Sequence, residues 1–206
     1  MNKNPIVDEY LEKKMKSPFY LIVFLCFLTN LPLKGQNTKM PVSIGYFAPY
    51  GVQYGAKAGI SIPWKNWESD RKEDQIRSYN LTLDPQIGYF VFPEVQNNFF
   101  LNMELAIRSH KNEKRFSPMA SAGLGYLLGL QKQEGSVNLA TGEIDFETTA
   151  LHYFVPTVSL GFNIKPKKSM GYYFKGFFGR KIIRGLEGST IIGAEAGITF
   201  NINQKN

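Results

Sequence analysis

Charged side chains inside otherwise apolar segments are the residues of this sequence with the clearest potential for chemistry. Each of them belongs to the polar row of a segment in which apolar residues alternate with polar or small ones. These charges are Lys57, Asp84, Glu104, Arg108, Lys175 and Glu195. Three are positive and three are negative, so they can neutralise one another as ion pairs if the fold gathers them in one interior.

Residue types that usually carry catalysis or bind metals give a weaker pattern. The only histidines are His110 and His152, and neither lies in a recognisable nucleophile motif. The only cysteine, Cys26, lies near the N-terminus, so the rest of the chain has no thiol ligand and no disulfide. No glycine-rich phosphate-binding loop is present. We therefore expect no catalytic residues, no metal site and no cofactor.

The elements that carry these charges are predicted to be β-strands. From Val52 onward, apolar and polar residues alternate with the period of a strand, and clusters of charge, glycine and proline interrupt the alternation. Each apolar row spans the roughly 9–11 residues with which a tilted barrel strand crosses a membrane. The residues expected to face lipid include Leu101, Met103, Leu105, Ile192, Ile198 and Phe200.

Such rows predict an all-β fold, an antiparallel up-and-down transmembrane β-barrel. Because a lysine or arginine facing lipid near the midplane costs about 2–4 kcal/mol, the charges should face the lumen. A soluble lipocalin-like barrel is the alternative fold, and it would have the apolar rows inside and the charges outside. The face on which the apolar residues lie therefore distinguishes the two folds.

Both termini of a single-chain bacterial barrel lie on the periplasmic side, which requires an even number of strands, and eight fits best. The predicted strands are 53–63, 78–91, 98–109, 115–125, 127–139, 146–164, 171–182 and 189–202. Residues 41–49 are either a lead-in or half of a bulged first strand, and residues 124–129 could equally continue one strand. From connection lengths, 64–77, 109–115, 140–148 and 183–188 are expected outside and 93–98 and 165–170 on the periplasmic side.

The first 35 residues have the three parts of a secretory signal peptide: basic Lys13, Lys14 and Lys16, an apolar run over 19–28, and a short polar exit. We expect cleavage before Gln36, with Met15 as an alternative start and residues 36–206 as one barrel domain. Part of the formal charge of +7 lies in or beside this signal. No basic helix or RNA-binding motif accompanies the remainder, so no nucleic-acid partner is expected.

The segment 195–202 alternates polar or glycine positions with apolar and aromatic ones. Together with the signal peptide and glycine–aromatic strands such as 121–126, it makes the chain resemble the small outer-membrane β-barrel proteins of Gram-negative bacteria. The resemblance implies location in the cell outer membrane, contact with outer-membrane lipid, and recognition by the barrel-assembly machinery through Gly197, Phe200 and Ile202. The short tail 203–206 departs from members that stop at an aromatic residue.

Three functions are compatible with these features. The first is a structural or interaction barrel whose lumen is plugged by the charge network. The second is a narrow channel or transporter for small or apolar molecules, and the third is a lipid-modifying enzyme. The balance of three positive and three negative charges favours the first.

Overall fold

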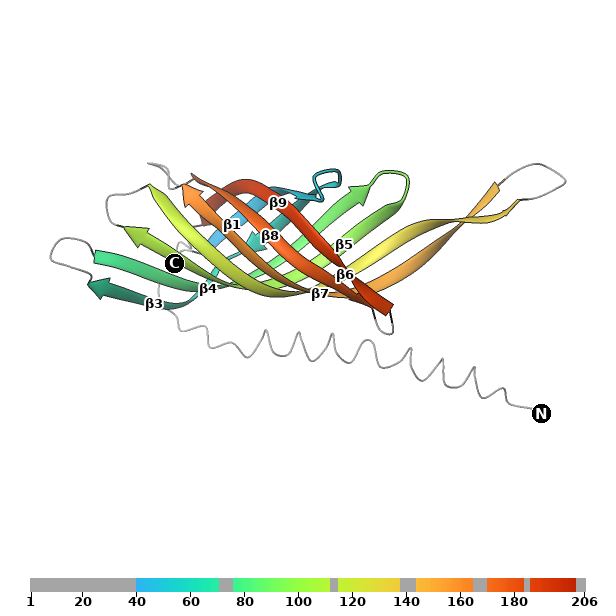
Figure 1. Ribbon diagram of the computed structural model, residues 1–206. Helices are drawn as coiled ribbons and strands as arrows, with labels where there is room; N and C mark the ends of the chain where they lie inside the picture. Colours follow the sequence, from blue (N-terminus) through green and yellow to red (C-terminus); the bar gives the residue numbers. More distant parts are fainter. Residues whose placement is uncertain are drawn as a thin grey trace, which may run out of the picture. The chain divides into compact units, whose positions relative to one another are not determined.

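The computed structural model describes residues 40–70, 76–111, 115–137, 144–164, 170–183 and 186–202, nearly all of them in β-strands (Figure 1). The strands are β1 (Met40–Pro49), β2 (Tyr54–Ile60), β3 (Ile62–Asp70), β4 (Ile76–Phe92), β5 (Gln96–Lys111), β6 (Phe116–Val137), β7 (Ile144–Ile164), β8 (Met170–Ile183) and β9 (Leu186–Ile202). They belong to one compact unit, 39–206. Within the described ranges, no helix has the length and apolar character needed to cross a membrane. The predicted signal peptide, 1–35, and the tail 203–206 lie outside these ranges.

The strands form a closed antiparallel ring. Their order is β2-β1-β9-β8-β7-β6-β5-β4-β3, and a further pairing of β2 with β4 closes it. On either side of Ser61, β2 and β3 pair in succession with the same strand, β4, so they act as one interrupted strand. The wall therefore has eight strand positions, and the predicted all-β, up-and-down barrel is confirmed.

The predicted strand bounds are wrong in several places. The strand predicted at 53–63 continues through β3 to Asp70, so residues 64–70 belong to the wall and not to a loop. Residues 41–49 form the full strand β1, which pairs along its length with β9, and 115–125 and 127–139 are one continuous strand, β6. The glycines that suggested a turn instead leave room for side chains of β5. A Cβ at Gly123 would lie 2.8 Å from Cγ of Glu104, and one at Gly125 would lie 3.2 Å from Oδ1 of Asn102.

These changes also alter which ends of the strands lie together. The barrel end that contains Met40 and Ile202, here the proximal end, also contains the junctions of β3 with β4, β5 with β6, and β7 with β8. The turns at 50–53 and 93–95 lie at the opposite, distal end, together with the junctions of β6 with β7 and β8 with β9. The expectation that 64–77 and 109–115 share an end with 140–148 and 183–188 is therefore wrong, as is the grouping of 93–98 with 165–170. The error arose because splitting β6 reversed the direction assigned to the strands before it.

The outer and inner faces of the wall carry different side chains. Outward residues are apolar and exposed, such as Leu160 at 74% and Leu124 at 60%, whereas the inward Lys175 and Glu195 are 3% and 2% exposed. Of the six residues expected to face lipid, Leu101, Leu105 and Ile192 are exposed, and the others are half-buried in the same rows. The predicted parity is confirmed, and the lipocalin-like alternative is contradicted.

Candidate functional site in the barrel interior

Inward-facing side chains fill the barrel in successive layers. Along β5 the order from the distal to the proximal end is Asn98, Phe100, Glu104 and Arg108, each on the inward row. Phe100 belongs to an apolar cluster, the aromatic layer, composed of Phe47, Phe90, Phe100, Leu127, Val155, Phe177 and Ile191. Glu104 belongs to the ion-pair layer, composed of Lys57, Glu104, Lys175 and Glu195.

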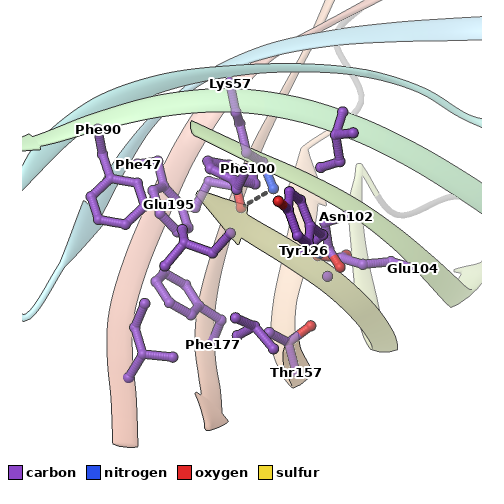
Figure 2. Close-up of a pocket in the computed structure, with 15 residues that line it drawn as sticks. Phe47, Lys57, Phe90, Phe100, Asn102, Glu104, Tyr126, Thr157, Phe177 and Glu195 are labelled. Atoms are coloured by element: carbon purple, nitrogen blue, oxygen red, sulfur yellow. Dashed lines mark hydrogen bonds and ion pairs between the residues drawn. The ribbon is translucent and has the colours of Figure 1, made fainter. Parts of the chain in front are cut away.

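The ion-pair layer is a chain of alternating charges. Glu195 Oε2 lies 2.6 Å from Lys57 Nζ (Figure 2). It also lies 3.4 Å from Lys175 Nζ, and Lys175 Nζ in turn lies 2.7 Å from Glu104 Oε2. The four residues come from β2, β9, β8 and β5, which are spread around the wall, so the chain crosses the lumen. Each of these side chains is almost completely buried, and each charge is compensated by a neighbour of opposite sign.

Hydrogen bonds hold the ion-pair layer in place. Ser121 Oγ donates to Glu104 Oε2 at 2.8 Å, and Asn102 Nδ2 donates to Glu104 Oε1 at 3.0 Å. At the other end, Lys57 Nζ donates to Gln86 Oε1 at 2.7 Å. Such charge-assisted bonds offset part of the desolvation cost of placing ions inside the barrel.

Arg108 and Asp84 form a separate ion pair nearer the proximal end. Arg108 Nη2 lies 2.5 Å from Asp84 Oδ2, and the same guanidinium donates to Thr82 Oγ1 at 2.5 Å and to Ser61 Oγ at 3.2 Å. All six predicted charges thus lie inside the barrel. Between the described residues, however, no ion pair joins this pair to the ion-pair layer. The six charges were predicted to form one network, and in the structure they form two separate groups of ion pairs.

The aromatic layer is the feature that the sequence analysis missed. Phe47 stacks on Phe177 with ring centroids 4.7 Å apart, and its ring lies 5.0 Å from that of Phe100 and 5.5 Å from that of Phe90 (Figure 2). Phe90 and Phe100 stand in the polar rows of β4 and β5. In each of these two strands the phenylalanine alternates in phase with a buried charge, and this alternation could have predicted that its ring faces the lumen.

A small cavity lies between the aromatic layer and the ion-pair layer. Its volume is about 50 Å³, and its lining includes Phe100, Lys57 and Glu195 (Figure 2). Asn102 Oδ1 and Thr157 Oγ1 belong to lining residues and are buried without a protein hydrogen-bond partner. Since about 10–15 Å³ of such space is enough to hold one water, the cavity has room for a few waters.

The two histidines lie on opposite faces of the wall. Inside the barrel, His110 Nδ1 lies 2.6 Å from Ser117 Oγ, whose side chain is fully buried. On the outer wall, His152 Nδ1 lies 2.5 Å from the hydroxyl of Tyr126, and both side chains are exposed. The two imidazoles therefore do not share one site, and the absence of enzyme activity stays a prediction.

Comparison with known proteins gives similarity at the level of fold. No protein-family model and no curated protein matches the sequence. The crystal structure of the outer membrane enzyme PagL is 14% identical with a TM-score of 0.48, covering 79% of this chain and 99% of that one. The N-terminal β-barrel domain of Pseudomonas aeruginosa OprF is 17% identical (TM-score 0.45; 82% and 100% covered), and Neisserial surface protein A is 8% identical (TM-score 0.47; 79% and 96%). These neighbours are small outer-membrane β-barrel proteins.

The residues expected to mark the chain for assembly lie on the seam between β9 and β1. Gly197 is opposite Gly45, Phe200 is opposite Val42, and Ile202 is opposite Met40. The ring of Tyr173 lies over the two glycines, so a Cβ at Gly197 would stand 2.6 Å from both Gly45 Cα and Tyr173 Cε1. Gly197 thus has a packing role in the folded barrel, and recognition by the assembly machinery stays a prediction.

Proposed function

We propose that this protein resides in the bacterial outer membrane and acts there as a structural or interaction barrel with a closed lumen. The outer wall supports the location. On β4, exposed Tyr89 and half-buried Tyr79 are ten positions apart (89 − 79 = 10), and on β6 exposed Phe116 and Tyr126 have the same spacing (126 − 116 = 10). Apolar outward residues lie between them. Two aromatic girdles separated by roughly 9–11 residues match the two interfaces of a membrane.

The positions of the first and last strands support an orientation. Met40 and Ile202 are paired at the proximal end of the barrel. Since single-chain bacterial barrels keep both termini in the periplasm, the distal end with the turns 50–53 and 93–95 should face the exterior.

The crossing of the lumen by buried, alternating ion pairs is the observation that carries the proposed role. A water-filled pore would hydrate these charges, whereas here Lys57, Glu104, Lys175 and Glu195 are at most 5% exposed and the adjoining cavity measures about 50 Å³. The aromatic layer adds a second closure on the distal side. Because the lumen is closed at two levels, we infer that the protein acts through the outer surface of the barrel and not through a pore.

The distal part of β6 and β7 offers such a surface. β6 pairs with β5 only as far as Gln131, and β7 pairs with β8 only from Phe154 onward. Beyond these positions, β6 and β7 continue to pair with each other as far as Val137 and Ile144. Figure 1 shows this hairpin, in yellow and orange, projecting from the barrel. A two-stranded arm on the exterior side suits contact with a partner.

Conductance and fractionation test the two parts of this proposal. Purified full-length protein in a planar bilayer is expected to give no stepwise current, and regular ohmic steps would favour the narrow-channel alternative instead. In a Gram-negative host the protein should sediment with outer-membrane markers. Recovery as a soluble periplasmic protein would contradict the location.

A further inference from the structure

Lys181 is a buried cation without a counter-ion in the described part of the chain. Its residue is 7% exposed, and its side chain lies on the inward row of β8. Among the described residues, no carboxylate lies within ion-pair distance of its Nζ and no group hydrogen-bonds to it. The six other inward charges discussed above are all paired.

Aromatic rings compensate this charge only in part. Lys181 Nζ lies 5.7 Å from the ring centroid of Tyr50 and 5.6 Å from that of Tyr153. Such contacts attract a cation to the ring face, but they do not replace the hydration or the counter-ion that burial removes. Within the residues that the structure describes, the charge of Lys181 is therefore compensated by aromatic rings alone.

The site lies at the distal mouth of the barrel, beyond the aromatic layer. On β5, Asn98 is two positions distal to Phe100, and on β7, Tyr153 is two positions distal to Val155. Lys181 is four positions distal to Phe177 on β8. These residues thus line the mouth that the aromatic layer closes from below.

Amide groups in this mouth also lack partners. Asn98 is 1% exposed, and neither its Nδ2 nor its Oδ1 has a hydrogen bond. The same is true of Gln96 Nε2, on the same strand, and of Oε1 of buried Gln53, in the turn between β1 and β2. Because buried polar groups are nearly always hydrogen-bonded, these unpaired amides are notable at the same end of the barrel as Lys181.

We propose that the distal mouth binds a small dissolved oxyanion, a carboxylate or a phosphate. Lys181 Nζ supplies the counter-charge, and the amides of Gln96 and Asn98 donate to the anion's oxygens. Gln53 Oε1, an unpaired acceptor at the same end of the barrel, suits the protonated oxygen of a hydrogen phosphate. The aromatic layer stops the anion at this level, so the site is a binding site at a closed end. This inference goes beyond the proposed function and does not depend on the barrel's partner.

Thermal unfolding of the full-length protein in a non-ionic detergent tests the proposal, because the detergent supplies no phosphate headgroup. Sodium phosphate or acetate should raise the Tm saturably relative to sodium chloride at equal ionic strength, since a ligand that binds only the folded state stabilises it. Lys181→Met, which keeps the apolar stem, should abolish the rise. Lys132→Met removes an exposed lysine of β6 and should leave the rise unchanged.

An equal Tm rise in Lys181→Met, or an equal rise with chloride, would overturn the proposal. NMR of ¹³C-methylated lysines in the unmutated protein provides a readout that does not depend on the variant's folding. The Lys181 signal should shift with phosphate at concentrations that leave the Lys132 signal in place. Uniform movement of both signals, or a response that requires added phospholipid, would show that no such site for a dissolved anion exists.

Discussion

At the scale of single residues, Glu195 connects the charges of the interior. Its carboxylate contacts both Lys57 and Lys175, so it compensates two ammonium groups at once. Glu104 contacts only Lys175 among the lysines and has Ser121 and Asn102 as additional partners. Loss of Glu195 is therefore expected to leave more uncompensated charge than loss of Glu104.

Replacing Glu195 by alanine should lower the free energy of unfolding by about 3–5 kcal/mol, because it leaves the buried ammonium group of Lys57 without its carboxylate partner. Denaturant unfolding in lipid vesicles measures the change. Glu68→Ala, at an exposed position of β3, is the matched control and should have little effect. If Glu195→Ala unfolds at the same denaturant concentration as the unmutated protein, the ion-pair layer is hydrated and the pore alternative gains support.

The Arg108–Asp84 pair allows a reversal experiment because it stands apart from the four-charge layer. Asp84→Ala and Arg108→Ala should each destabilise the barrel, since each leaves a buried partner uncompensated. Asp84→Arg combined with Arg108→Asp should recover part of the stability lost in either single reversal. A double-mutant cycle measures the coupling, and strictly additive effects would argue against a direct interaction between the two side chains.

At the scale of elements, glycines adapt the strands to their neighbours. In the middle of β6 they make room for inward side chains of β5, and on the β1–β9 seam they make room for Tyr173. These positions lack the side chain that would otherwise clash, so a glycine within a strand pattern here marks close packing and not a turn.

Gly197→Ala should impair refolding of the purified chain into detergent micelles, where no assembly machinery is present, because its Cβ would meet backbone of β1. Gly176→Ala on β8 is the control, since the nearest atom to its Cβ position is 3.9 Å away. Phe200→Ala should refold normally and lose assembly only in cells. Normal refolding of Gly197→Ala would assign this glycine to recognition alone.

At the scale of the whole molecule, the proposed orientation gives the two ends of the barrel different exposure to the cell exterior. Val52 is 65% exposed in the distal turn, and Glu68 is exposed on β3 near the proximal end. The proposed orientation places the first outside the cell and the second in the periplasm.

Cysteine labelling tests this orientation, in a background in which Cys26 is replaced by serine. A membrane-impermeant maleimide should label Val52→Cys on intact cells and Glu68→Cys only after the outer membrane is permeabilised. Both sites should react equally in denaturant, which controls for expression. Labelling of Glu68→Cys alone on intact cells would mean that the barrel is inserted with its proximal end outward.

The sequence by itself determined the fold class and the face on which each side chain lies. Alternation with period two is a local property of an extended backbone, so the apolar row of Leu101 and Leu105 and the opposite row of Glu104 and Arg108 can be identified without any neighbour. The physical cost of a charge in lipid then assigns the second row to the lumen.

Only the tertiary structure decided which charges meet, and where the lumen is sealed. Lys57 and Glu195 are 138 positions apart (195 − 57 = 138), and their contact depends on the register of β1 with both β2 and β9. The aromatic layer likewise forms only when closure of the barrel brings Phe47, Phe90 and Phe177 to one level, because these residues come from three different strands. Strand pairing across such separations is fixed by ring closure and interior packing, which no local pattern of residues records.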